Sequence, residues 1–353
     1  MRAKIIAIVL AFLTILGLSG RPLRTAEAQF RFQDNFWVNL HHFVRAEARR
    51  RAFNAPLGMP MSTLSEAERS AWSSSVDAYA DLAKLSLIFD ERLVRINNVL
   101  AARGEEAALP EGLVEPGVLA ALNRAAPIYR THLWPEHHRL NEEWIATIRP
   151  LVEQHAPALT RALADAYHVQ WPKEPILVDA SCEGGPVGAY TTGGPPGTAA
   201  HTVIAPSQVH DLDAAFEIVF HEASHSVDDQ IMKNIDAEAA RQKVKPDPNL
   251  WHALIFYTSG ELVKRELHKE KDPGYKPYAY RFGVYDRGWQ PLRAGLEKDW
   301  QPYLDGKVSF SQALTRLVAD CSTKEEAPKE PGAPVTPAAN LLGAAEQRGP
   351  DLA

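Results

Sequence analysis

The sequence predicts an α+β fold that is predominantly helical and contains one small antiparallel sheet. Three observations support this class. Residues 36–167 carry apolar and charged side chains at helical spacing. Residues 176–204 alternate short apolar runs with Gly/Pro turns, a pattern typical of strands. Helical spacing resumes near residue 212 and continues to about 319. We therefore expect a sheet that packs on the helix following it.

The predicted elements follow this order along the chain. Helices are expected at 65–101, 116–129 and 135–167, the last bent near Pro150 because proline removes a helical hydrogen bond. The expected strands are 176–178, 189–192 and 201–204. Later helices should be interrupted by the proline-containing stretches 246–248 and 273–277.

The chain divides into four predicted segments. Residues 1–28 resemble an export signal, with Arg2 and Lys4 before an apolar run and Ala26-Glu27-Ala28 as a cleavage site. Residues 29–170 form a helical N-terminal region, 171–322 a catalytic domain, and 323–353 a disordered Pro/Ala-rich tail. The signal predicts a periplasmic or secreted protein without a membrane anchor after cleavage.

Charge and cysteine content narrow the possible partners. The formal net charge is -6, which argues against nucleic acid or an anionic membrane as a partner. Cys182 and Cys321 are the two cysteines of the chain, and in an oxidising compartment they predict one intramolecular disulfide.

The segment 212–229 carries the chemistry. Leu212, Phe216, Val219, Ala223 and Val227 form an apolar stripe at helical spacing, and His221 and His225 of the run His221-Glu222-Ala223-Ser224-His225 lie on the opposite side. The two histidines are one turn apart, so their imidazoles project in the same direction, as two ligands of a tetrahedral Zn²⁺ must. Glu222 points to the side of that face, where its carboxylate can take a proton from a water at the metal.

The motif His221–Glu222–x–x–His225 resembles the HExxH signature of the zincin metallopeptidases, and residues 218–227 match its extended form. The resemblance implies a zincin-like catalytic domain, His221 and His225 as zinc ligands, and Glu222 as general base. The metzincin pattern is absent, because Asp228 and Ile231 occupy its next glycine and histidine positions. The aspzincin Gly-Thr-x-Asp signature is absent too, which leaves similarity to the gluzincins.

In the gluzincins the third zinc ligand is a glutamate on a later helix, and Glu261 is the candidate here. It follows Gly260 on a predicted helix, on a largely apolar face where an unpaired carboxylate would be costly. Arg265 departs from the family pattern, which often has an acidic residue at that position. Glu238 and Glu266 are the alternative ligands. Asp228 is expected to hydrogen-bond to one of the histidine ligands rather than to bind the metal itself. His252 is half a turn out of phase with Glu261 and is expected to be structural.

Related enzymes often use a tyrosine or histidine beyond the third ligand to stabilise the oxyanion. Tyr278 and Tyr285 are the candidates in this sequence. In zincins an edge strand often pairs with the extended substrate backbone, and residues 189–192 or 201–204 could do so here. The Gly193–Gly197 loop would then form a rim or flap.

The leading hypothesis is an exported zinc metallopeptidase that acts on a peptide or protein substrate through a zinc-activated water. Two alternatives stay open: a zinc hydrolase of a non-peptide amide, and a catalytically inactive zincin-like binding or scaffold protein. The presence of Glu222 favours the active forms, because an inactive descendant loses this residue most easily.

Overall fold

The computed structural model describes residues 29–185, 188–209, 211–270 and 274–324. The predicted export signal and residues 325–353 of the predicted tail lie outside the described residues. The N-terminal elements are β1 (Phe30–Gln33), α1 (Phe36–Ala52), α2 (Glu66–Asp77), α3 (Glu91–Ala101), α4 (Pro116–His132) and α5 (Trp134–Tyr167). The central elements are β2 (Ile176–Ala180), β3 (Ala189–Gly193), β4 (Ala200–Ile204), α6 (Leu212–Ser224), α7 (Asp228–Gln242) and β5 (Val244–Pro246). The last are α8 (Leu250–Glu270), α9 (Tyr278–Arg281), α10 (Gln290–Gly295), α11 (Gln301–Leu304), α12 (Phe310–Asp320) and β6 (Ser322–Lys324).

The described chain is predominantly helical with a small sheet, which confirms the α+β class. The prediction of an antiparallel sheet is wrong. The strand order is β1-β2-β4-β3, and β1, β2 and β4 run parallel while only β3 is antiparallel to its neighbour. The predicted and observed sheets differ for two reasons. β1 comes from a stretch that was expected to belong to the helical region. In addition, β3 forms a hairpin with β4, whereas β2 pairs in parallel with the other side of β4.

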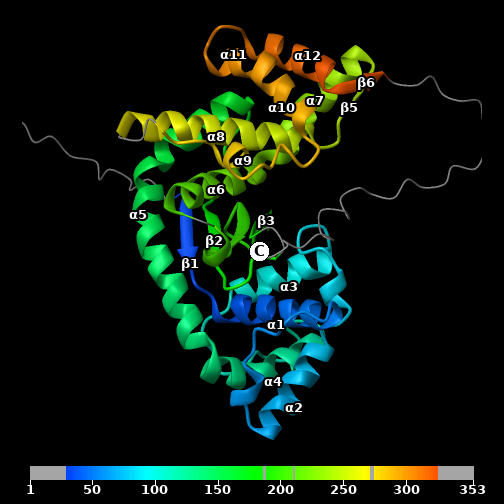
Figure 1. The fold of residues 1–353 in the computed structure, drawn as a ribbon, viewed down its shortest axis with the longest axis vertical. Coiled ribbons are helices and arrows are strands. Elements are labelled where there is room, and N and C mark those ends of the chain that lie inside the picture. Colours follow the sequence, from blue (N-terminus) through cyan, green and yellow to red (C-terminus); the bar gives the residue numbers. More distant parts are fainter. Residues whose placement is uncertain (1–28, 186–187, 210, 271–273, 325–353) are drawn as a thin grey trace, which may run out of the picture.

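The sheet separates two hydrophobic clusters (Figure 1). Helices α1 to α4 pack together and contact one face through Leu177, Tyr190 and Val203. Helices α5 and α6 pack against the other side of the sheet, and α8 packs on α5 and α6 beyond them. The predicted helical region 29–170 therefore contributes to both hydrophobic clusters, because β1 and α5 belong to the cluster that also contains α6 and α8.

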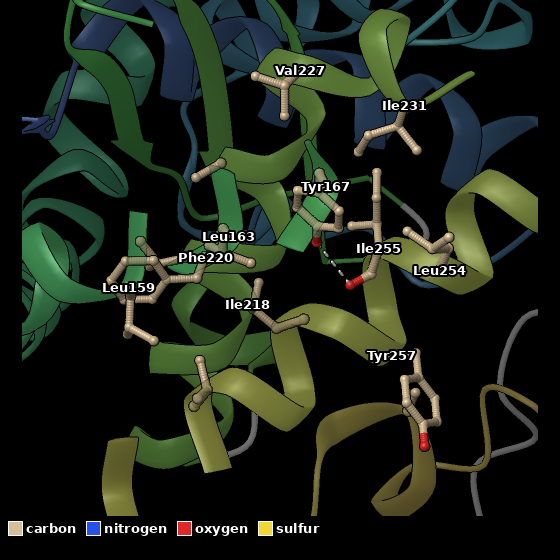
Figure 2. Packing of buried hydrophobic residues seen from close by; sticks show 14 of the residues in the cluster. Leu159, Leu163, Tyr167, Ile218, Phe220, Val227, Ile231, Leu254, Ile255 and Tyr257 are labelled. Carbon is tan, nitrogen blue, oxygen red and sulfur yellow. Dashed lines mark hydrogen bonds between the residues drawn. The ribbon is translucent and has the colours of Figure 1, made fainter. Parts of the chain in front are cut away.

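Helix α6 is fixed by its contacts with α5 and α8. Figure 2 shows Leu159 and Leu163 of α5 beside Ile218 and Phe220 of α6. The hydroxyl of Tyr167 donates to the backbone oxygen of Ile255 on α8 at 3.4 Å. The predicted apolar stripe of α6 is buried except for its first residue, Leu212, which is 43% exposed.

A buried polar network lies on the opposite face of the sheet. Nε2 of His42 on α1 lies 2.7 Å from the hydroxyl of Tyr190 on β3, and Asn97 of α3 donates to the same hydroxyl at 3.2 Å. His201 of β4 contacts Asp179 of β2 at 2.6 Å, with both side chains fully buried. The hydrogen bonds of His42 and Asn97 join α1 and α3 to β3. The contact between His201 and Asp179 joins β4 to β2.

The structure corrects two further predictions. Cys182 and Cys321 are both unpaired, because one packs against the cluster of α1 to α4 and the other belongs to the core around α12. The predicted tail begins too early, because Thr323 and Lys324 belong to β6, which pairs with β5. No helix in the described ranges has the length and apolar character needed to cross a membrane.

Candidate metal centre

The two motif histidines lie where helix α6 ends. His221 is in its last turn, and His225 begins a short 3-10 turn, His225–Val227, before α7 starts. Despite this change of helix type, the two rings remain close, with centroids 5.1 Å apart. His221 is 2% exposed and Glu222 5% exposed, so the motif faces the protein interior more than solvent.

The third nitrogen donor at this site is His252, in the first turn of α8. Ring nitrogens of His221, His225 and His252 all lie within 4.8 Å of one another. The Nε2 atoms of His221 and His252 are 3.3 Å apart. Two nitrogens bound to one tetrahedral zinc at about 2.0–2.1 Å are separated by about 3.3 Å. The spacing of His221 and His252 is compatible with a shared zinc ion, and the three histidines form a candidate metal centre among the described residues.

Glu261 does not join this group. It lies nine residues beyond His252 on the same helix, which places it half a turn around and roughly 13 Å farther along the axis. Its carboxylate lies 3.4 Å from the ammonium group of Lys264. His252, and not Glu261, therefore lies with the motif histidines, and it is the candidate third ligand instead of a purely structural residue.

The two alternative glutamates are engaged elsewhere. Oε1 of Glu266 lies 3.2 Å from Nδ1 of His155, and the carboxylate of Glu238 accepts hydrogen bonds from Arg241. Neither belongs to the histidine group. Among the described residues, the donors grouped at the candidate centre are therefore the three imidazoles.

Burial and mutual proximity keep two of the imidazoles neutral. Burial, followed by the positive potential of His225 and His252, lowers the pKa of His221 well below its usual value. Burial and His225 likewise lower the pKa of His252. An imidazole binds a metal only in its neutral form, and the lowered pKa values of these two rings favour that form.

Aromatic side chains hold the rings in place. Phe256 stacks on His221 with centroids 3.7 Å apart, and Trp251 stacks on His252 at 5.0 Å. Trp289 meets His252 edge-on at 5.5 Å. The sequence signal for His252 is a histidine on a helix face rich in aromatic residues. This pattern does not identify a metal ligand, because it is more common in ordinary protein cores.

Glu222 is held by the neighbouring strand. The hydroxyl of Thr191 on β3 donates to its Oε2 at 2.8 Å, and the hydroxyl of Thr202 on β4 lies 2.8 Å from that of Thr191. Burial raises the pKa of Glu222, against smaller lowering effects of His225 and the Thr191 hydrogen bond. A raised pKa suits a carboxylate that must accept a proton near neutral pH and release it again. The motif gave no indication of Thr191.

Asp228 lies behind the second histidine of the motif. Its Oδ2 is 3.6 Å from Nδ1 of His225. A carboxylate at this nitrogen orients a metal-binding imidazole and leaves its other nitrogen for the ion. Asp228 is not part of the histidine group itself.

The two candidate tyrosines have different surroundings. Tyr278 is half-buried, its ring is nearly parallel to that of Phe256, and the charge of Glu222 contributes to raising its pKa, although burial is the main cause. Tyr285 is fully buried and packs against Tyr280. Its pKa is raised mainly by burial and then by the charge of Glu217. Tyr278 is the tyrosine beside the site, because its ring is nearly parallel to that of Phe256, which stacks on His221.

Of the two strands considered for substrate pairing, β3 lies at the edge of the sheet and β4 lies inside it. The turn after β3 forms one wall of a surface groove of about 570 Å³, whose other wall is α3. Gly194, Pro195 and Pro196 line this groove, and the three histidines do not.

No family model, curated protein or solved structure matches this chain.

Proposed function

We propose that this chain is an exported zinc-dependent peptidase whose metal ligands are His221, His225 and His252. The observation that carries the proposal is the convergence of three imidazole donors within 4.8 Å, beside a buried carboxylate held by Thr191. Three imidazoles and one open position are the arrangement of a catalytic rather than a structural zinc site.

Each residue has a distinct task in this proposal. Zinc, when bound, supplies Lewis-acid chemistry and makes a water acidic near neutral pH. Glu222 takes the proton of the attacking water and delivers it to the leaving amine. The hydroxyl of Tyr278 is the candidate donor to the oxyanion that develops on the substrate carbonyl.

The edge strand favours a polypeptide substrate. β3 carries Thr191, which holds Glu222, and the outer side of the strand is unpaired within the described chain. An extended peptide that pairs with β3 would run directly past the general base. This geometry favours a peptide over a small amide, which cannot use a strand edge.

The ligand assignment is tested by comparing His252→Ala with Glu261→Ala. Purified wild type should hold one zinc per chain by elemental analysis and should hydrolyse casein or a peptide library. His252→Ala should lose most of its zinc under dialysis, because it removes one of three protein ligands. Glu261→Ala should retain zinc, because its carboxylate pairs with Lys264.

The outcomes separate the hypotheses. Zinc loss in Glu261→Ala together with retention in His252→Ala would restore the glutamate as third ligand. Wild type without zinc would refute the metal centre. Zinc without hydrolysis of any peptide would favour another amide substrate or a binding role.

A further inference from the structure

Glu217 is a fully buried carboxylate on α6, one turn before His221. Its Oε2 accepts two hydrogen bonds, from the hydroxyl of Tyr275 and from the backbone N–H of Tyr278 at 2.8 Å. Burial raises its pKa to about 7, and the two hydrogen bonds act in the opposite direction. A buried carboxylate is costly unless it is paired, and both of these donors come from one short segment.

That segment is enclosed from the other side by α8. Gly260 has no side chain, and a Cβ added there would lie 2.7 Å from Cβ of Pro277 and 3.0 Å from Oε1 of Glu217. The close approach therefore depends on glycine. As a result, residues 275–278 are held between the helix that carries His221 and the helix that carries His252.

The residue fixed by this arrangement is Tyr278. Its ring lies 6.4 Å from that of Phe256 with an interplanar angle of 15°, and Phe256 in turn stacks on His221. A displacement of the 275–278 backbone would move the tyrosine relative to Glu222. Oxyanion donors act only when they are held in position before the charge develops.

We propose that Glu217 is a positioning residue that holds Tyr278 over the metal centre through the Tyr278 amide and the Tyr275 hydroxyl. The proposal rests on the proposed peptidase function and assigns a role to a residue outside the zinc-binding motif. It differs from a purely structural role, because loss of Glu217 should affect turnover only through Tyr278.

The test combines Glu217→Leu, Tyr278→Phe and the double variant, with Glu297→Leu as the matched control. Leucine removes the acceptor, whereas a glutamine could still accept both hydrogen bonds. Glu297 accepts a hydrogen bond from Tyr280 in the same short helix at 2.8 Å, whereas the Tyr278 amide donates to Glu217. Four quantities are measured for each protein: zinc content, kcat and KM on a cleaved peptide, and hydrogen exchange at the Tyr278 amide.

Glu217→Leu should retain zinc, lower kcat by roughly 10- to 100-fold and leave KM within about threefold of wild type. In the Tyr278→Phe background it should cause little further loss. Exchange at the Tyr278 amide should become at least about tenfold faster, because the amide has lost its acceptor. Glu297→Leu should match wild type in all four quantities.

A full additional loss of kcat in the double variant, or unchanged exchange at the Tyr278 amide, would overturn the proposal. If Glu217→Leu does not fold, Tyr275→Phe removes one of the two donors and should change exchange and kcat in the same direction. If wild type cleaves no peptide, the peptidase assignment fails, and the exchange measurement still decides whether Glu217 holds the segment.

Discussion

At the residue scale, Glu222 combines burial with one hydrogen bond from Thr191. This leaves its second oxygen, Oε1, for proton transfer. A glutamine in its place has the same shape and can still accept the threonine hydrogen bond, but it cannot act as a base.

Glu222→Gln should therefore keep its zinc and lose roughly 10²- to 10⁴-fold in kcat. Zinc content is measured by elemental analysis and turnover on the peptide identified with wild type. A variant that binds zinc and turns over at the wild-type rate would exclude Glu222 as the general base.

The sequence predicted that His221, Glu222 and His225 would lie close together, because helical periodicity can be counted over so short a segment. It could not predict His252, which lies 27 residues later and converges with the motif only through the packing of α8 on α6. Glu261 was chosen because its helix face is apolar. The structure shows that Glu261 pairs with Lys264 and that His252 occupies the opposite side of the helix.

At the element scale, the β3–β4 hairpin positions Thr191 against Glu222. The hairpin turn requires glycine at 194, because a Cβ there would lie 2.8 Å from the backbone carbon of Ala200 and would collide with the hydroxyl of Thr198. At Gly193 an added Cβ meets nothing within 4 Å.

Gly194→Ala should lower the free energy of unfolding by about 1–3 kcal/mol, because the new methyl group meets backbone that cannot move aside without disturbing the hairpin. Chemical denaturation measures the change, and Gly193→Ala is the matched control. Equal stability of the two variants would show that the turn adapts at little cost.

The elements were predicted more reliably than their pairing. Apolar runs and Gly/Pro turns indicated β2, β3 and β4 in nearly their observed places. The sheet prediction failed because β1 is only Phe30–Gln33 and pairs with residues more than 140 positions away, which no local pattern reveals. Helix α6 also ends three residues before Val227, since the 3-10 turn at His225 leaves the apolar periodicity almost unchanged.

At the scale of the whole molecule, the buried network around His42 joins the N-terminal helices to the sheet. Burial lowers the pKa of His42 from 6.5 to about 3. The unfolded chain therefore binds a proton below about pH 6.5 that the folded chain does not. This contribution to stability is present above pH 6.5 and is lost as the pH falls towards 3, by up to about 1.4 kcal/mol per pH unit.

His42→Gln should reduce this acid sensitivity, because glutamine does not titrate and can keep a hydrogen bond to Tyr190. Between pH 6.5 and 5 the wild type should lose about 2 kcal/mol more than the variant. Urea titrations at the two pH values give the comparison. Parallel losses in the two proteins would show that His42 is already protonated in the folded state.

The two cysteines lie in different hydrophobic clusters and cannot be joined without taking both apart. Titration of denatured, unreduced protein with a thiol reagent should therefore give two thiols per chain, and reduction beforehand should not change the unfolding temperature. A yield near zero would show that the oxidised protein contains the disulfide predicted from the sequence.

With His252 in place of Glu261 as third ligand, the proposed centre would carry a different overall charge. A glutamate ligand would cancel one unit of a divalent ion's charge, whereas three neutral rings cancel none. The nearby carboxylates of Glu222 and Asp228 do not belong to the histidine group. Asp228 approaches His225. Small anions should therefore compete for the open position of this centre more strongly than at one with a carboxylate ligand.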